Sequence, residues 1–258
     1  MAVVLGAVVL AAALAGTSID GSASHHTGSE RSGSTPTSAP FSGAVGKVVY
    51  QSDFKASDGW RTGAVSPSVF ASITKSGYLI TASGAGHFLL PTPYVNAATG
   101  VSVTTSVTFY PETSLSFGAA CQSNPEGNGT SLTALSSLSP TGGSFVYQFV
   151  VHPDGDWYLE KGDLPTQQIT IVQEGTSSAL HGRASIELLC NSDRPVGNDT
   201  KTVLLGYING IPAVYDAELQ AGLPPGGWTP VLLVGSAGPP VSATFTSMSV
   251  RVVPPGAT

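Results

Sequence analysis

From residue 47 onward, apolar and polar side chains alternate in short runs that are interrupted by Gly, Pro, Asn or Asp. These interruptions come about every 8 to 12 residues, the spacing typical of a β-sandwich or barrel. No run follows the 3.6-residue period of an amphipathic helix over about 12 residues. The pattern predicts strands at 47–54, 78–83, 86–92, 101–110, 116–121, 145–151, 156–162, 168–173, 183–190, 202–208, 211–219, 229–236 and 241–253.

One predicted hairpin joins 202–208 to 211–219 through Asn209 and Gly210. Both turn residues tolerate the positive φ that a two-residue type I′ turn requires. The strand 202–208 is apolar on both faces, which indicates a strand covered on each side. Pro212 lacks an N–H donor, so we expect it at an edge, a bulge or a non-bonded position.

A second hairpin is predicted between 145–151 and 156–162. Pro153 presets φ, Asp154 can cap the turn locally, and Gly155 can occupy the left-handed site. Both hairpins are antiparallel connections, so the pattern favours an antiparallel sheet.

The residues before 47 have a different composition. Residues 1–16 are apolar and uncharged, which predicts a signal peptide or the end of a truncated membrane anchor. Residues 17–46 are rich in Ser, Thr and Gly and predict a flexible linker. Residues 47–258 are then long enough for one large two-sheet antiparallel jelly-roll sandwich, and we expect an all-β domain there.

The composition indicates the cellular environment of the chain and limits the classes of partner that it can bind. Charged residues make up 10% of the chain and the net charge is −6, against a typical charged share of about 25%. The few Lys and Arg are scattered, so nucleic acid is excluded as a partner. We expect the chain to contact a membrane only through its N-terminal segment. We expect a monomer located outside the cell or at the cell surface.

The chain has two cysteines, Cys121 and Cys190, each flanked by apolar residues. An even number of cysteines in an exported chain suggests one disulfide, and two buried free thiols are the alternative. Neither cysteine lies in a Cys-x-x-Cys pattern, so a zinc or redox centre has little support.

Several motifs, taken in order, resemble the concanavalin A-like lectin/glucanase superfamily, in particular its laminin-G-like and keto-disaccharide-hydrolase-like bacterial extracellular jelly rolls. They are "SDFKASDGWRTG" at 52–63, "FGAAC" at 117–121, "YQFVVHPDGDWYLEKG" at 147–162, "IELLC" at 186–190 and "VLLGYINGIPAVYD" at 203–216. Thr246 in the closing strand stands where the family usually has an acidic residue. The resemblance implies a concanavalin A-like sandwich, a Cys121–Cys190 bridge and Trp60 in the core. It leaves activity open, because a fold does not determine a function.

Catalysis by paired carboxylates has weak candidates. Retaining glucanases of this superfamily place acids on alternate strand residues, which share a face. Asp216 and Glu218 have this spacing but lack a third acid. They are therefore a weak general acid/base pair, and a solvated strand end is the alternative.

A metal site also has one weak candidate group. His152, Asp154 and Asp156 form the densest polar cluster of the chain. Oxygen ligands of this kind suit Ca²⁺, so calcium is a possible cofactor. Solvated Asp residues are, however, common in turns.

Sugar binding requires exposed aromatic rings that stack against pyranose C–H faces, together with polar groups that bind hydroxyls. Trp157 and Tyr158, beside the turn that contains Asp154, and Trp228 in a predicted loop are the candidates. Alternation requires either Trp157 or Tyr158 to face inward. The long insertion 122–144 could cover a binding groove.

The sequence as a whole favours an exported, non-catalytic binding module for a polysaccharide or glycan at the cell envelope. A glycoside-processing hydrolase of the same fold that uses Asp216 and Glu218 is the alternative. A structural ectodomain of a membrane sensor is a third interpretation. An aromatic groove would favour the binding module, and a face without one would favour the ectodomain.

Overall fold

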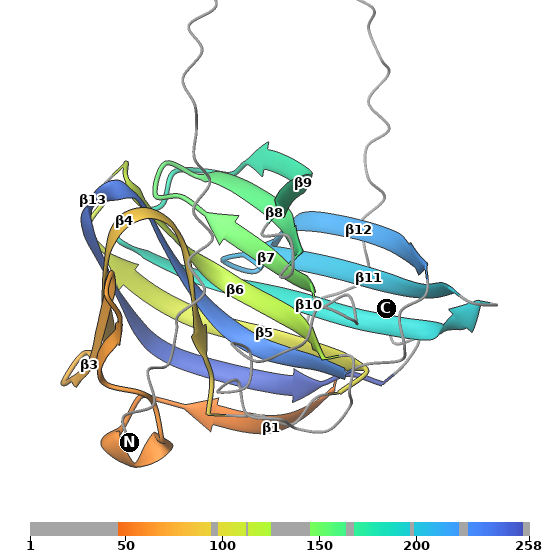
Figure 1. The fold of residues 1–258 in the computed structure, drawn as a ribbon, viewed down its shortest axis with the longest axis horizontal. Coiled ribbons are helices and arrows are strands. Elements are labelled where there is room, and N and C mark those ends of the chain that lie inside the picture. Colours follow the sequence, from red (N-terminus) through yellow and green to blue (C-terminus); the bar gives the residue numbers. More distant parts are fainter. Residues whose placement is uncertain are drawn as a thin grey trace, which may run out of the picture.

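The computed structural model describes residues 46–93, 98–111, 113–124, 145–163, 168–196, 199–221 and 227–254. These residues form an antiparallel all-β fold, which confirms the predicted fold class (Figure 1). One short 3₁₀ helix interrupts the strands. The elements are β1 (Lys47–Ser52), η1 (Ala56–Asp58), β2 (Gly63–Ser66), β3 (Val69–Thr74), β4 (Gly77–Pro91), β5 (Gly100–Phe109), β6 (Leu115–Asn124), β7 (Phe145–Val151), β8 (Asp156–Asp163), β9 (Gln168–Thr176), β10 (Arg183–Val196), β11 (Asp199–Ile208), β12 (Ile211–Ala221) and β13 (Gly227–Val252).

The strands make a continuous sheet in the order β12-β11-β10-β5-β13-β6-β7-β8-β9. The first part of β13 pairs with β6 and the later part pairs with β5, so β13 passes from one layer of the sandwich to the other. We call the layer with β6, β7, β8, β9 and the adjoining parts of β4 and β13 the β7 sheet. The layer with β5, β10, β11, β12, β1 and the later part of β13 is the β10 sheet.

Two long strands turn the corner between the layers together. β4 and β13 stay paired through the bend, where Gly84 lies opposite Gly238. Both glycines have positive φ, which glycine adopts without a Cβ penalty. Pattern analysis predicts strand ends at these glycines. The structure instead continues each strand around a bend, so two pairs of predicted strands merge into β4 and β13.

The core lies between the two layers. Inward side chains from β6 and β7 pack against those from β5, β10 and β11 in one buried cluster. A Cys121–Cys190 disulfide joins β6 to β10 and therefore links the two layers. Its Cα atoms lie 6.4 Å apart. The predicted bridge is confirmed.

Both predicted hairpins are present. Asn209 and Gly210 have φ of 53° and 77°, as a type I′ turn requires. Pro212 lies on β12, an edge strand, next to an irregularity in its pairing with β11. In the other hairpin β7 pairs with β8, and Gly155 takes the positive φ of 103°.

β11 is covered on both faces, as its apolar pattern predicts. Leu204 and Ile208 belong to the main core. Val203 and Leu205 lie in a second buried cluster on the outer face of the β10 sheet. The alternation of strand side chains produces this division.

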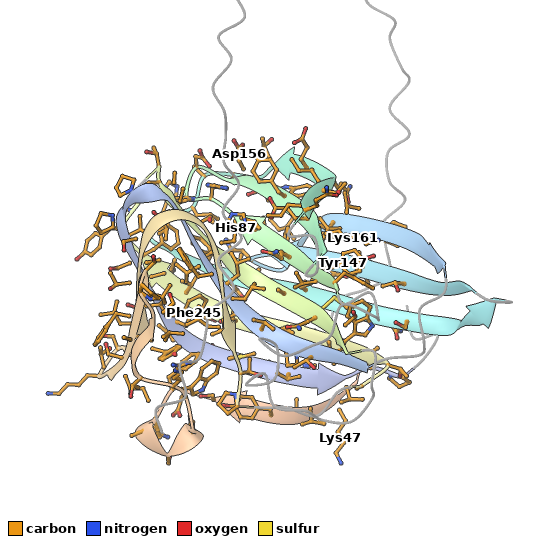
Figure 2. The ribbon with its side chains drawn as sticks, in the orientation of Figure 1. Lys47, His87, Tyr147, Asp156, Lys161 and Phe245 are labelled. Atoms are coloured by element: carbon orange, nitrogen blue, oxygen red, sulfur yellow. A yellow bond between two sulfur atoms is a disulfide. The ribbon has the colours of Figure 1, made fainter. Side chains whose placement is uncertain are left out.

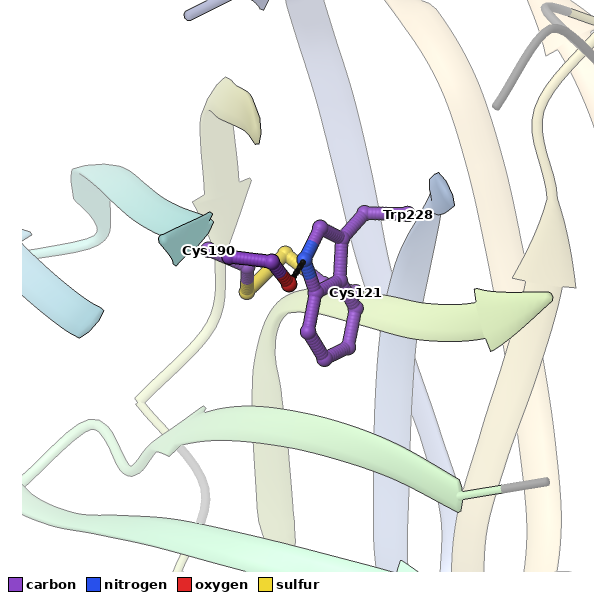
Figure 3. The surroundings of a disulfide bond; sticks show 4 residues. Cys121, Cys190 and Trp228 are labelled. Atoms are coloured by element: carbon purple, nitrogen blue, oxygen red, sulfur yellow. Dashed lines mark hydrogen bonds between the residues drawn. A yellow bond between two sulfur atoms is a disulfide. The ribbon is translucent and has the colours of Figure 1, made fainter. Parts of the chain in front are cut away.

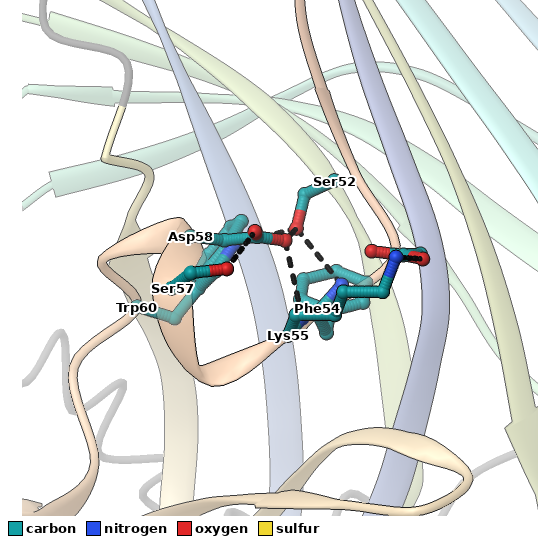
Figure 4. Close-up of polar contacts among 7 residues, drawn as sticks. Ser52, Phe54, Lys55, Ser57, Asp58 and Trp60 are labelled. Carbon is teal, nitrogen blue, oxygen red and sulfur yellow. Dashed lines mark hydrogen bonds and ion pairs between the residues drawn. The ribbon is translucent and has the colours of Figure 1, made fainter.

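The turn after β1 is organised around Ser52 (Figure 4). The Ser52 hydroxyl donates to Asp58 Oδ2 at 2.6 Å, and it accepts from the Phe54 N–H at 2.9 Å and from Trp60 Nε1 at 3.0 Å. The Lys55 N–H also donates to Asp58 Oδ2. These hydrogen bonds, chiefly the one from Ser52, lower the pKa of Asp58. Trp60 is 5% exposed, so its predicted core position is confirmed.

Residues 1–16 and 17–46, predicted as signal peptide or anchor and as linker, lie outside the described residues, and β1 begins at Lys47. Within the described part of the chain, no helix has the length and apolar character needed to cross a bilayer.

Candidate functional site

β7 shows which side chains reach the outer face of the β7 sheet, the face turned away from the core. Phe145, Tyr147 and Phe149 belong to the main core. By alternation, Val146 and Gln148 point to the opposite face. Val146 packs there in a separate small cluster with Ala120 and Val231 from the neighbouring strands β6 and β13. The outer face therefore has its own apolar floor.

This outer face is strongly curved. His87 on β4 and Glu160 on β8 are separated by β13, β6 and β7 in the sheet. Four strand spacings would place them about 19 Å apart on a flat sheet. Instead, His87 Nδ1 and Glu160 Oε2 lie 3.1 Å apart. The β7 sheet therefore curls until its strands β4 and β8 meet across the outer face.

The His87–Glu160 contact is partly shielded from water. The side chains are 20% and 11% exposed, respectively. By alternation, Val150 and Leu233 also point to this outer face, and both are fully buried there. A polar group this shielded needs a hydrogen-bond partner, because burying it unpaired costs free energy. His87, which is labelled in Figure 2, supplies that partner from a part of the chain 73 residues away.

Gln148 is the most unusual side chain of this face. It lies directly opposite Glu160 on β8 and Ala120 on β6, and none of its surface is exposed. Neither its amide oxygen nor its amide nitrogen has a hydrogen-bond partner in the described part of the chain. A buried polar group without a partner costs about 1–3 kcal/mol. Gln148 therefore has unused donors and an unused acceptor at the centre of the face.

Gly162 leaves space beside this amide. A Cβ atom at Gly162 would lie 3.3 Å from Gln148 Nε2 and 3.0 Å from Val146 Cγ1. Both distances are tighter than ordinary contacts, so a larger residue would press against the amide and the floor. Glycine at this position keeps the side of Gln148 open.

Tyr158 marks the polar end of the face. It lies on β8 opposite Val150 and Glu174, and its ring meets the His152 ring edge-on with centroids 5.7 Å apart. Burial is the main cause that raises the Tyr158 pKa, and nearby carboxylates, including Glu174, raise it further. Burial likewise lowers the pKa of His152. Tyr158 is half-buried and is the aromatic candidate that faces outward.

Trp157 and Trp228 do not have the exposure that stacking on a sugar requires. Trp157 is 6% exposed and packs edge-on against Phe149 in the core. Trp228 is 2% exposed and packs near Tyr147. Because both rings are buried, neither Trp157 nor Trp228 forms the exposed aromatic surface expected from the sequence. Alternation correctly predicted that one of Trp157 and Tyr158 would face inward.

The surroundings of Trp228 explain its burial. The residue lies near the start of β13 rather than in a loop, and its Nε1 donates to the Ser192 hydroxyl at 2.8 Å. The indole lies beside the disulfide that joins the layers (Figure 3). It therefore closes the end of the core instead of presenting a surface.

The three weak candidates for calcium binding do not form a metal-binding group in the described structure. Among the described residues, no group of three or more His, Cys, Asp and Glu side chains could hold a metal ion. Asp154 is exposed, and its Oδ1 accepts the Asp156 N–H at 3.1 Å, so this carboxylate caps the turn. His152 packs against Tyr158. The segment from His152 to Asp156 is a turn that borders the outer face, and calcium binding by this weak candidate group stays a prediction.

The weak catalytic pair lies on the other layer. In the backbone pairing, Asp216 lies opposite Leu204 and Glu218 opposite Thr202, both on β11 of the β10 sheet. The side chains of Asp216 and Glu218 lie outside the described part of the structure, as do residues 125–144 of the insertion predicted to cover a groove. A catalytic role for this pair stays a prediction.

Sequence reasoning missed Gln148 and the His87–Glu160 contact. Gln148 did carry a signal, because it interrupts the otherwise apolar strand "FVYQFVV". His87 and Glu160 are 73 residues apart, and no local pattern connects them.

Comparison with known proteins identifies the fold. No protein-family model matches the chain, and no curated protein matches it. A solved structure from Bacillus subtilis, described as a protein of unknown function with a galectin-like fold, is 12% identical, with a TM-score of 0.55 over 82% of this chain and 99% of its own.

Two further solved structures are less similar. The alginate lyase Aly36B is 10% identical, with a TM-score of 0.49 over 82% of this chain and 99% of its own. The carbohydrate recognition domain of Emp46p in its potassium-bound form is 9% identical, with a TM-score of 0.43 over 72% of this chain and 88% of its own. The Bacillus subtilis likeness shows that the chain is similar to galectin-like sandwiches in fold.

Proposed function

We propose that this chain is an exported, non-catalytic glycan-binding module of the concanavalin A-like superfamily, and that its site is the outer face of the β7 sheet. Gln148 is the observation that carries this proposal. Its buried amide has no hydrogen-bond partner in the described residues, although most buried polar groups in proteins are paired. A ligand that supplies the missing partners would recover the cost of burying this amide.

Sugar hydroxyls match the unused groups of Gln148. The amide offers two N–H donors and one carbonyl acceptor, and a hydroxyl can both donate and accept. Binding sites of this kind combine an apolar lining with a few well-placed polar groups. Here Val150 and Leu233 supply the apolar floor, and Tyr158 supplies an aromatic ring at the border.

The curled sheet also limits how a glycan can bind. The His87–Glu160 contact crosses the face above the buried floor. A ligand that reaches Gln148 must therefore displace this contact or bind along its margin. Replacing a buried hydrogen bond by ligand hydroxyls is feasible, because polar ligand groups can satisfy both freed partners.

The disulfide supports the proposed location. A bridge between β6 and β10 persists in an oxidising compartment, as outside the cell. The hydrolase alternative would act through Asp216 and Glu218 on the β10 sheet, and the ectodomain alternative would need no ligand at all. The same assay separates all three.

The test is a binding screen of the full chain against neutral, amino and acidic oligosaccharides, with product analysis after long incubation. We expect saturable binding without product. Gln148→Leu should weaken binding at least tenfold while it slightly raises the melting temperature, because the substitution removes an unpaired buried amide. Ser102→Ala, on the outer face of the β10 sheet, is the control and should bind normally.

Other results would contradict the proposal. If Gln148→Leu binds with unchanged affinity, the binding site lies elsewhere on the chain. Products that disappear in Asp216→Asn would support the hydrolase. A complete lack of binding would leave the structural ectodomain.

A further inference from the structure

The border of the outer face is acidic. Asp154, Asp156, Glu160 and Glu174 all act electrostatically on the Tyr158 hydroxyl. Three of them, Asp154, Asp156 and Glu160, also act on His152. Glu174 and Asp154 are exposed, whereas Glu160 lies deeper in the face. A ligand bound beside Tyr158 therefore meets several negative charges.

Among the described residues of the β7-sheet strands, no Lys or Arg side chain lies at this border. Lys161 is the single Lys or Arg among the described residues of the β7-sheet strands. Its Nζ lies 5.2 Å from the centre of the Phe145 ring and 5.7 Å from that of Tyr147, both of which face the core. Lys161 is thus engaged on the opposite side of the sheet from Tyr158.

Of the two histidines at this border, His152 adds little positive charge. Burial lowers the pKa of His152, so its neutral form is favoured. His87 is engaged with Glu160. The net field at Tyr158 therefore comes mainly from carboxylates.

Such a border discriminates between classes of sugar. Carboxylates repel a uronate and attract an ammonium group, with an energy that depends on distance and shielding. An ammonium group is also attracted to the face of an aromatic ring. Tyr158 can contact the apolar face of a sugar ring while Glu174, opposite it on β9, is near enough to meet the charge.

We propose that this site prefers glycans with free amino groups, such as glucosamine units, over acetylated and acidic glycans. The inference rests on the proposed glycan-binding function and names the ligand class. The two halves of the site have separate roles. Gln148, buried and unpartnered beside Glu160, binds hydroxyls that all sugars share, whereas the acidic border selects the amine.

The test compares three tetrasaccharides by calorimetry with the full chain, at a pH where the free amine is protonated. The probes are a glucosamine tetramer, its N-acetylated counterpart and a galacturonate tetramer. We expect the glucosamine tetramer to bind about tenfold more tightly than the acetylated one, and the galacturonate tetramer to bind most weakly. Added salt should reduce the preference, because exposed charges are screened.

Glu174→Gln should reduce the preference several-fold and leave the affinity for the acetylated tetramer unchanged. Glu174 is exposed, so this variant is expected to fold. Asp53→Asn, which removes an exposed carboxylate near η1 that pairs with Lys55, is the matched control and should keep the full preference.

The outcomes distinguish the two proposals. Equal affinity for the amine and its acetylated form, or tightest binding of the galacturonate tetramer, would overturn the amine preference and leave glycan binding intact. Failure of all three tetramers to bind would overturn both. A preference that survives in Glu174→Gln would overturn the acidic border as its cause.

Discussion

The two sheets of the sandwich differ in the side chains that make up their outer faces and in how the polar ones are paired. On the β10 sheet, Leu189, Val203 and Leu205 form an apolar cluster, and the neighbouring Ser102 hydroxyl donates to Glu187 Oε1 at 2.6 Å. On the β7 sheet, the apolar floor surrounds Gln148, whose amide has no partner among the described residues.

This difference indicates distinct roles for the faces. On the β10 face, Ser102 is paired with Glu187 and the Asn191 Nδ2 donates to the Pro254 carbonyl, although the Asn191 Oδ1 has no partner among the described residues. With its apolar cluster, this face contributes mainly to stability. The β7 face keeps an unpaired amide at a cost of about 1–3 kcal/mol. Proteins commonly retain such costs where a ligand binds. The predictions below test the contrast, beginning with the largest expected effect.

Removing the disulfide tests whether the two faces belong to one cooperative unit. The Cys121→Ala/Cys190→Ala double variant should lose about 4 kcal/mol of unfolding free energy, the chain-entropy value for a loop of this size. The bridged residues are 69 positions apart. Urea denaturation followed by tryptophan fluorescence and circular dichroism measures the loss, and the two signals should change together. A loss below about 1 kcal/mol would show that the layers hold together without the bridge.

Truncating the apolar cluster tests the structural role of the β10 face. Leu205→Ala should cost about 3 kcal/mol, because it removes a side chain that is 5% exposed and leaves a cavity. Tyr215 lies opposite Leu205 and is 70% exposed. Tyr215→Ala should therefore change the unfolding free energy by less than about 0.5 kcal/mol. Similar losses in both variants would contradict the burial of this face.

Two polar substitutions should have effects of opposite sign on stability. Ser102→Ala removes a hydrogen bond to Glu187 and should cost about 1 kcal/mol. Gln148→Leu removes an unpaired amide and should add about 1 kcal/mol. Chemical denaturation of both variants measures the difference directly. Destabilisation by Gln148→Leu would show that its amide is paired in solution and would remove the contrast between the faces.

The smallest effect is a pH dependence that comes from His152. Burial lowers its pKa in the folded protein, whereas the unfolded chain binds the proton near pH ~6.5. Above this pH, His152 is neutral in both states, and the folded protein keeps its full stability. This stability declines as the pH falls, because the unfolded state then gains a proton that the folded state resists.

His152→Asn should show a flatter stability profile between pH 7 and 5 (roughly the range over which the unfolded imidazole titrates). His181→Asn, which changes an exposed histidine, should keep the profile of the unchanged protein. Thermal melts across the pH series provide the comparison. Identical profiles for His152→Asn and the unchanged protein would refute the lowered pKa.

Local sequence was sufficient for most strands and for both hairpins, because strand alternation and turn chemistry involve neighbouring residues. It was less reliable at the corner between the layers. Glycine at positions 84 and 238 indicated strand ends, yet the paired strands bend there and continue. The short strands β2 and β3 were missed, since 63–74 offers little alternation.

The candidate site was only partly predictable. Alternation required one of Trp157 and Tyr158 to face inward but left open which one, because that choice depends on the packing of the whole layer. Trp228 was expected in a loop. The structure places it at the start of β13, where pairing and the core cover it.

The sequence by itself determined the all-β class, the turns at Asn209–Gly210 and Pro153–Gly155, and the two cysteines able to form a bridge. These features depend on side-chain type and short spacing. Only the tertiary structure decided that His87 meets Glu160 and that Gln148 is buried without a partner. Both depend on the curl of the β7 sheet, which accumulates from the twist between successive strands and brings distant segments together.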